Sequence, residues 1–181
     1  SNEGDGGRII VWSNSNTQFY GFIDASADGT GDGGFVETSG KAYLNATGNV
    51  DASSNSGDAG QWLIAHADLD IVACAPGCDT ATFCSCVWQS NPPGCAGSPS
   101  LLSVCSINTN LNAGTSIIIM TNAAGCGQGD IDVQATITKS AGACASLTMR
   151  AHRDILFSTG GITSTPSGGA LNVTLEADVN A

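Results

Sequence analysis

The stretch that decides the fold is GGFVETSGKAYLNATGNVDASSNSGDAG, residues 33–60, because it repeats the plan of the residues before it. The preceding segment, GGRIIVWSNSNTQFYGFIDASADGTGD (6–32), also opens on two glycines and alternates apolar and polar residues in short runs. The related elements GFIDAS and GNVDAS begin at Gly21 and Gly48, one period of 27 residues apart. A period in this range is typical of solenoid proteins, in which each repeat packs on its neighbours.

The short runs alternate with a period of two residues, and no ten-residue window carries the apolar stripe of a helix. Two or three strands per coil, repeated without helices, predict an all-β chain folded as a parallel β-helix. The crossover rule for parallel strands makes such a superhelix right-handed. The side chains expected to point inward are Ile9, Val11 and Phe19 in the first coil, Tyr43 and Val50 in the second, and Leu63 and Ile71 in the third.

The pattern stops after LDIVAC, which ends at Cys74, and residues 75–106 are rich in Pro, Gly, Ser and Cys. It resumes with TSIIIMT, ASLTMRAH and ALNVTLEAD, expected to be equivalent strands, and with their partner strands DIDVQATI and DILFSTGGI. We therefore predict one continuous solenoid domain with about five to six coils at this period. Its parts are coils over residues 1–74, a Cys-rich insertion loop over 75–106, and further coils over 107–181.

Charge and hydropathy exclude several kinds of partner. The chain has 5 Lys and Arg against 16 Asp and Glu, a formal net charge of −11, so nucleic acid and anionic membranes are not expected partners. No run of 18 apolar residues is present, so no membrane insertion is expected. The chain begins at Ser1 in the middle of the pattern, and we expect it to be a processed or excised piece of a longer protein.

Eight cysteines in 181 residues favour an oxidising compartment and disulfide bonds. Zinc is the alternative, but the spacings Cys74-x3-Cys78 and Cys84-x-Cys86, without a neighbouring histidine, differ from those of zinc sites. Cys126 and Cys144 lie in turn segments expected to stack in neighbouring coils, which predicts a bridge between them. The other six cysteines lie in or beside the insertion, and the sequence does not determine how they pair: Cys74, Cys78, Cys84, Cys86, Cys95 and Cys105.

The segments GGRIIVWSN, GGFVETSGKAYLNATGNVDAS, INTNLNAGTSIIIMTNAAG and LTMRAHRDILFSTGGITSTPSGGALNVTLEAD resemble the repeats of the filamentous haemagglutinin family of two-partner-secreted bacterial exoproteins. The resemblance covers nearly the whole chain outside residues 75–106. It implies a right-handed β-helix, secretion to the bacterial surface, and an adhesive or structural role without catalytic residues. Two features differ from the family: its repeats are generally poor in cysteine, and its N-terminal cap for the transporter is not evident here.

Several titratable residues are candidates for a functional site. The His-x-Asp elements at His66 and His152 fit a general base, but a repeated element in a repeat protein is first a product of the repeat. The pairs Asp68 with Asp70 and Asp130 with Asp132 fit a glycosidase, and we expect solvated outer faces instead. Three acidic residues in a glycine-rich turn fit a calcium site, and we expect a plain acidic turn: Asp24, Asp28 and Asp32.

No catalytic residue, metal site or cofactor is therefore predicted. Phe83 and Trp88 make the insertion a candidate interaction loop. A β-helix without caps leaves unpaired strand edges at its ends, which are templates for another chain.

We predict a secreted structural or adhesive β-solenoid at the bacterial cell surface, a subunit that stacks head to tail into an extracellular filament. Its expected partners are further copies of itself and a host or neighbouring cell surface or its glycans. The alternatives are a ligand-binding or glycan-binding adhesin segment cut from a longer rod, and a β-helical polysaccharide-degrading enzyme.

Overall fold

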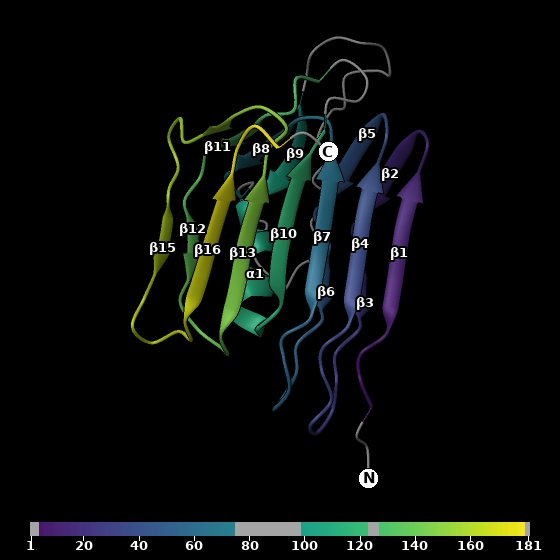
Figure 1. Ribbon diagram of the computed structural model, residues 1–181, viewed down its shortest axis with the longest axis vertical. Coiled ribbons are helices and arrows are strands. Elements are labelled where there is room, and N and C mark those ends of the chain that lie inside the picture. Colours follow the sequence, from purple (N-terminus) through teal and green to yellow (C-terminus); the bar gives the residue numbers. More distant parts are fainter. Residues whose placement is uncertain (1–3, 75–98, 123–126, 180–181) are drawn as a thin grey trace.

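The computed structural model describes residues 4–74, 99–122 and 127–179, which form a right-handed parallel β-helix of about five turns. In Figure 1 the strands of the front layer run upward, and the chain passes over the top to the back layer while it advances leftward. The predicted fold class is confirmed.

Sheet A is the front layer, and it contains one strand from each coil in chain order (Figure 1). Its strands are parallel and in register, so that Phe35 pairs with both Arg8 and Gln61. The predicted equivalence of TSIIIMT, ASLTMRAH and ALNVTLEAD is confirmed, because their strands are neighbours in this sheet. The strands are β1 (Arg8–Ser13), β4 (Phe35–Gly40), β7 (Gln61–His66), β10 (Ser116–Thr121), β13 (Ala145–Arg150) and β16 (Leu171–Glu176).

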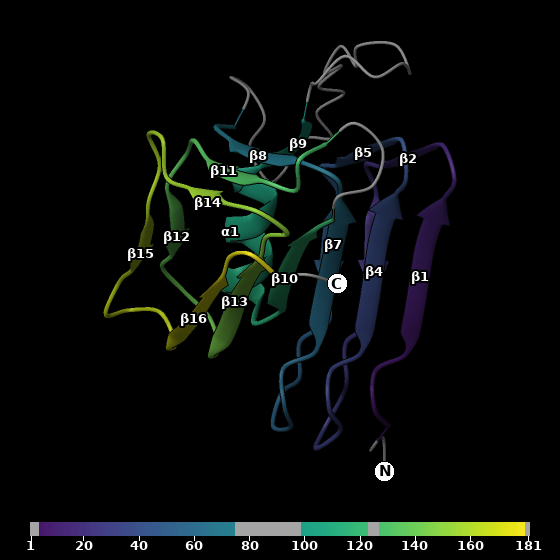
Figure 2. The ribbon, with the colours of Figure 1, turned by 45° about the horizontal axis from the view of Figure 1, so that its top comes forward.

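Sheet B forms the second side of the coil and the top of the molecule in Figure 2. Its strands, in spatial order, are β2 (Asn16–Phe19), β5 (Tyr43–Ala46), β9 (Ser100–Ser103), β8 (Leu69–Val72), β11 (Ile131–Val133) and β14 (Ile155–Leu156). The third side has two strand pairs, β3 (Phe22–Asp24) with β6 (Asn49–Asp51) and β12 (Ile137–Lys139) with β15 (Ile162–Ser164). Ile23 pairs with Val50, as the repeated elements GFIDAS and GNVDAS predict.

Inward side chains of sheet A stack in columns along the solenoid axis. One column contains Val36, Trp62, Ile117 and Leu147, all fully buried. Of the predicted inward residues, Phe19, Val50 and Ile71 are buried. Ile9 and Val11 share the inward columns but are only partly buried, because β1 is the edge strand.

The prediction was wrong for Tyr43 and Leu63, which face outward. Their neighbours Leu44, Trp62 and Ile64 occupy the core instead. A shift of one residue along a strand exchanges its two faces. In both segments apolar residues occupy both faces, so alternation alone could not choose between them.

The expectation of coils without helices was also wrong. Helix α1 (Val104–Ala113) begins after Ser103, whose side chain accepts a hydrogen bond from the Cys105 N–H, and ends at Gly114 with φ 93°. Buried Val104, Ile107 and Leu111 form its apolar stripe. Asn and β-branched residues are weak helix formers, which hid this single short helix from the sequence.

The helix lies between β6 and β12, where a coil would otherwise place a strand of the third side. Its asparagine side chains supply the missing ladder acceptors. Asn110 Oδ1 accepts the Val50 N–H at 2.8 Å, and Asn108 Oδ1 accepts the Thr138 N–H at 2.8 Å. Asparagine side chains of this helix thus accept hydrogen bonds from backbone N–H groups of the strands on both sides of it.

We expect Asn110→Ala to lower the free energy of unfolding by about 1–3 kcal/mol, because it leaves the buried Val50 N–H without an acceptor. Asn112→Ala is the control, since Asn112 Oδ1 accepts the exposed N–H groups of Ser140 and Ala141, which water can replace. Denaturant unfolding of both variants tests this. Equal losses would contradict the role assigned to Asn110.

Two strands that follow one another in the chain, β8 and β9, both belong to sheet B. Strand β8 pairs with β9 and β11, and β9 lies between β8 and β5 although it follows β8 in the chain. Residues 100–106, expected in the insertion, therefore belong to the solenoid, and the border of the insertion moves to a point before Ser100. Ordinary alternation in SLLS was too short to distinguish a strand from loop sequence.

Candidate functional site

Cys74 and Cys105, two of the cysteines predicted to form disulfides, are bonded to each other with their Cα atoms 5.6 Å apart. They follow the ends of β8 and β9, where Val72 pairs with Ser103. The bond therefore fastens the ends of two strands that are neighbours in sheet B. This role is structural.

Cys144 is a free, exposed thiol in the structure. Its predicted partner Cys126 lies outside the described residues, so the bridge between them stays a prediction. The remaining residues of the predicted disulfide set and interaction loop also lie outside the described residues: Cys78, Cys84, Cys86, Cys95, Phe83 and Trp88.

The His-x-Asp elements do not form a catalytic pair in the described structure. His66 is buried, and its Nδ1 lies 3.2 Å from the backbone oxygen of Asp68, not from the carboxylate. The Asp68 carboxylate instead accepts the backbone N–H groups of Gln128, Gly129 and Asp130, with the Gly129 contact at 2.7 Å. Asp68 thus fastens the adjoining coil.

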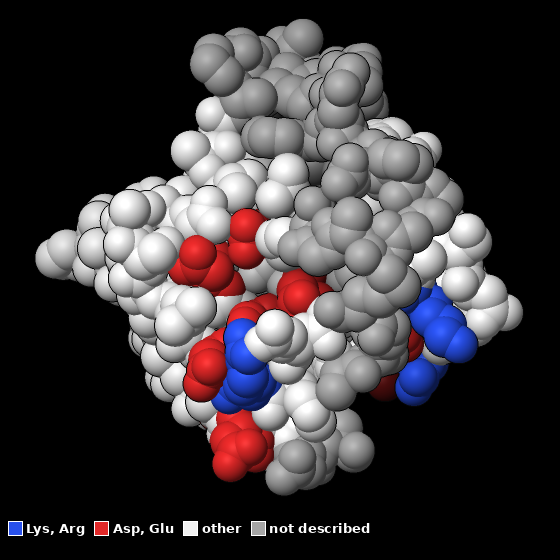
Figure 3. All heavy atoms as spheres, turned by 90° about the horizontal axis from the view of Figure 1, so that it is seen from above, with Lys and Arg blue, Asp and Glu red and all other residues white. Residues whose placement is uncertain are grey.

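The paired carboxylates join neighbouring coils of sheet B. Asp70 and Asp132 are register partners, and both accept hydrogen bonds from Gln134 Nε2, at 2.9 and 3.0 Å. Asp130 accepts from Arg153 Nε at 2.7 Å. Figure 3 shows acidic side chains gathered around a basic patch on the described part of this upper face.

Their environments shift two carboxyl groups in opposite directions. Burial, and then the charge of Asp132, raises the pKa of Asp70 above its ordinary value. The hydrogen bond from Arg153 lowers the pKa of Asp130. Ionised Asp70 is therefore destabilising as the pH rises through its raised pKa, whereas ionised Asp130 is stabilising until the pH falls through its lowered pKa.

Asp70→Asn is expected to raise the free energy of unfolding at pH 7, by at most about 1 kcal/mol, because it removes a carboxylate that is costly when charged. Asp130→Asn is the matched variant, and we expect it to lower stability at pH 7 by up to about 1 kcal/mol. The difference at Asp70 should vanish as the pH falls below the ordinary aspartate pKa of about 3.9, and the difference at Asp130 only when the pH falls below its lowered pKa. Urea unfolding at several pH values measures this, and effects of equal sign at pH 7 would refute it.

The acidic turns are held by hydrogen bonds within each turn and by one between neighbouring coils. Asp24 Oδ1 accepts from the N–H and hydroxyl of Ser26, and Asp51 Oδ1 makes the same pair of bonds to Ser53 one coil later. Asp32 Oδ1 accepts the Asp58 N–H at 2.8 Å. Within the described ranges, no group of three or more His, Cys, Asp or Glu is arranged to hold a metal ion.

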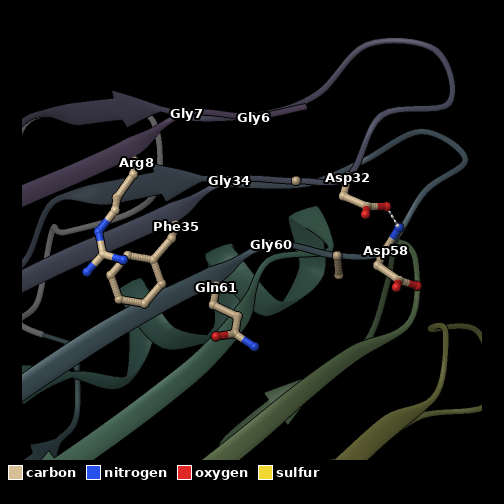
Figure 4. Close-up of a pocket in the computed structure, with 11 residues that line it drawn as sticks. Gly6, Gly7, Arg8, Asp32, Gly34, Phe35, Asp58, Gly60 and Gln61 are labelled. Carbon is tan, nitrogen blue, oxygen red and sulfur yellow. Dashed lines mark hydrogen bonds between the residues drawn. The ribbon is translucent and has the colours of Figure 1, made fainter. Parts of the chain in front are cut away.

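A shallow groove of about 350 Å³ crosses the first three coils where the strands of sheet A begin (Figure 4). The Arg8 guanidinium lies 4.7 Å from the centroid of the Phe35 ring on one wall. Asp32 and Asp58 form the other wall. The floor consists of the glycine-rich segments at residues 6–7, 33–34 and 59–60.

The glycines of this floor have a packing reason. A Cβ on Gly33 would lie 2.0 Å from the Ala52 carbonyl oxygen, and one on Gly60 would lie 2.2 Å from the Gly34 carbonyl oxygen. At Gly6, Gly33, Gly34 and Gly60 the coils can therefore stack only without a side chain, whereas Gly7 has open space around its Cβ position. Coil packing thus requires at least one glycine in each of these segments.

The two ends of the solenoid are its most distinctive described feature. At the C-terminal end, Val173 and Leu175 are 42% and 45% exposed although they stand in the inward columns of sheet A. One coil earlier, Leu147 and Met149 occupy the same columns and are fully buried. The apolar interior is therefore open at this end. Phe157 and Leu156 add further exposed apolar surface beside it.

At the N-terminal end the same two columns begin with Ile9 and Val11, which are partly buried. Strands β1 and β16 are the two edges of a wholly parallel sheet. A further β1 placed beside β16 would continue both the strand direction and the apolar columns. The sequence alone did not identify Val173 and Leu175 as exposed, because their place in the inward columns follows only from the strand register.

The fold defines the chain as a parallel β-solenoid, and the described residues fasten its coils to one another. No protein-family model matches the chain, and no curated protein matches it. The resemblance to the filamentous haemagglutinin family therefore stays a prediction. None of the helices in the described part of the chain is long and apolar enough to span a membrane.

Proposed function

We propose that this protein is a secreted structural β-solenoid of the bacterial cell surface that stacks end to end into an extracellular filament. The observation that supports this most is the match between the two ends. Both present unpaired parallel strand edges, and Val173 and Leu175 at one end share their columns with Ile9 and Val11 at the other.

The proposed junction repeats the contacts between coils inside the molecule. Val173 would pack on Ile9 of the next copy and Leu175 on its Val11, as Leu147 and Met149 pack on neighbouring coils within the chain. Full burial of such side chains contributes about 1.5–3 kcal/mol each. The two joined surfaces differ, and each added copy would continue the solenoid axis of the one before it, so the contact would not close into a ring and would generate a filament.

The extracellular location rests on the cysteines. The Cys74–Cys105 bond and the total of eight cysteines are typical of oxidising compartments. An adhesive role, with a cell surface or glycan as partner, rests on the resemblance to the exoprotein repeats. The adhesive role would be a second role of the same filament rather than a separate function.

Electron microscopy of the native, unreduced protein tests the proposal. Val173→Asp places a charge in the open column, and we expect it to abolish filaments. Thr174→Asp, on the same strand but pointing outward, is the control that retains them. Circular dichroism establishes that both variants fold.

Long fibres from the wild type and short rods from Val173→Asp would support end-to-end stacking. Short rods from the unreduced wild type would overturn it and indicate a segment of a longer rod, whose ends other parts of that chain cover. Repeating the experiment with reductant measures how far disulfides hold the fibres together.

A further inference from the structure

We propose that the outer face of sheet A pairs with the same face of a second copy, so that two solenoids associate side by side in opposite directions. This lateral contact uses a different surface from the end-to-end junction and does not depend on it. The occupant of the face is therefore another molecule of this chain.

The outer face of sheet A is unusually apolar for a surface. Ile10 and Trp12 are 52% and 56% exposed, and further apolar side chains continue the patch across the sheet. The outer face of sheet B differs in its charge, because it presents Asp70 and Asp132 beside apolar side chains such as Tyr43 and Leu156. The apolar outward residues of sheet A are Ile10, Trp12, Phe35, Leu63, Ala65, Ile118 and Met120.

Charge also singles out this face. Its four charged residues are two Arg and two Glu, whereas the whole chain has a net charge of −11. Each of the four has an intramolecular contact: Arg8 with the Phe35 ring, Glu37 with the Ser39 hydroxyl, and Arg150 with Glu176. A second copy with the same negative charge meets the least repulsion here.

The area suffices for a stable contact. Six strands spaced about 4.8 Å apart, each six residues long at about 3.3 Å per residue, cover roughly 500–600 Å². A face-to-face pair would bury on the order of 1,100 Å² in total, which reaches the threshold of about 1,000 Å² for a specific interface. Stacked sheets at about 10 Å separation are an ordinary arrangement.

The side chains select one of two symmetric orientations. With the two-fold axis along the strands, β7 lies over β10 of the other copy, so that Leu63 faces the partner's Ile118 and Ala65 faces the partner's Met120. With the axis along the solenoid, Glu37 would face the partner's Glu37. The first orientation places the apolar centre of one face on that of the other and brings no two like charges together. In this orientation the two solenoids are antiparallel.

Analytical ultracentrifugation of the wild type and of Val173→Asp, which blocks only the proposed end contact, tests the lateral contact. We expect Val173→Asp to form discrete dimers. Adding Ile118→Glu should raise the dimer dissociation constant at least about tenfold, because it buries a charge at the centre of the face. Gln18→Glu, on the outer face of sheet B, is the control and should leave it unchanged.

Two substitutions at Trp12 test the orientation. In the antiparallel pair Trp12 faces the partner's Glu176, so Trp12→Glu should weaken dimers by about three- to tenfold and Trp12→Lys should weaken them less. The opposite order would indicate that Trp12 faces the partner's Arg8 and would overturn the antiparallel pairing. Monomeric Val173→Asp, together with single-width wild-type fibres, would overturn lateral pairing and leave end-to-end stacking intact.

Discussion

Trp62→Ala should lower the free energy of unfolding by about 3–5 kcal/mol, the cost of removing a large aromatic side chain from a packed core. Trp62 is fully buried and packs edge to face against Phe19, with ring centroids 6.3 Å apart. Its Nε1 donates to Thr38 Oγ1 at 3.1 Å, so the substitution also leaves a buried hydroxyl without its donor. Guanidinium unfolding under non-reducing conditions measures the loss.

The other described tryptophan supplies the control. Trp12 is 56% exposed on the outer face of sheet A, and Trp12→Ala should change the stability of the isolated solenoid by less than about 1 kcal/mol. Trp62→Phe separates the two contributions, because it retains an aromatic ring and loses the hydrogen bond to Thr38. A loss below about 1 kcal/mol for Trp62→Ala would show that the column is not packed as described.

Removing the Cys74–Cys105 bond should cost about 4 kcal/mol. The two cysteines are 31 residues apart, and the entropy of closing a loop of that length in the unfolded chain gives this magnitude. The double variant Cys74→Ser with Cys105→Ser is preferable to a single one, because a lone thiol could exchange with other cysteines. Thermal and denaturant unfolding measure the change.

Cys144→Ser is the matched control for this prediction. Its thiol is exposed and free in the structure, so its loss should change the free energy of unfolding by no more than about 0.5 kcal/mol. A large effect of Cys144→Ser would instead support the predicted bridge to Cys126. An unchanged double variant would contradict the role of the Cys74–Cys105 bond in holding β8 beside β9.

The repeat was predictable because coil packing requires certain residue types at fixed positions of each coil. The doublet at Gly33-Gly34 stands where a side chain would collide with the neighbouring coil. Which side chains of each strand point inward was not predictable, since Tyr43 and Leu63 are apolar and yet point outward. Lys139 is a further example. It follows Ile137 at the inward spacing and is fully buried, with its Nζ donating to the Leu111 and Ala141 carbonyl oxygens at 2.8 Å each.

Burial lowers the pKa of Lys139, and the Leu111 carbonyl oxygen near the end of helix α1 is one of the two acceptors for its ammonium group, beside that of Ala141. A lysine in a solenoid core is intelligible only once that helix is known, and the helix itself has no strong sequence signal. The exposed residues at the edges of sheet A were not predictable, because the column that joins Ile9 to Val173 follows only from the register of every coil between them.

The position of β9 bears on how the molecule can be assembled. Strand β8 has as its neighbours only β9 and β11, and both are later in the chain. If the chain folds from its N-terminus, two coils and β7 can form first, but β8 then has no neighbouring strand with which to pair. Further growth waits until β9 has docked on β5. Folding in this direction therefore includes a pause, and the thiols of Cys74 and Cys105 meet at the moment when it ends.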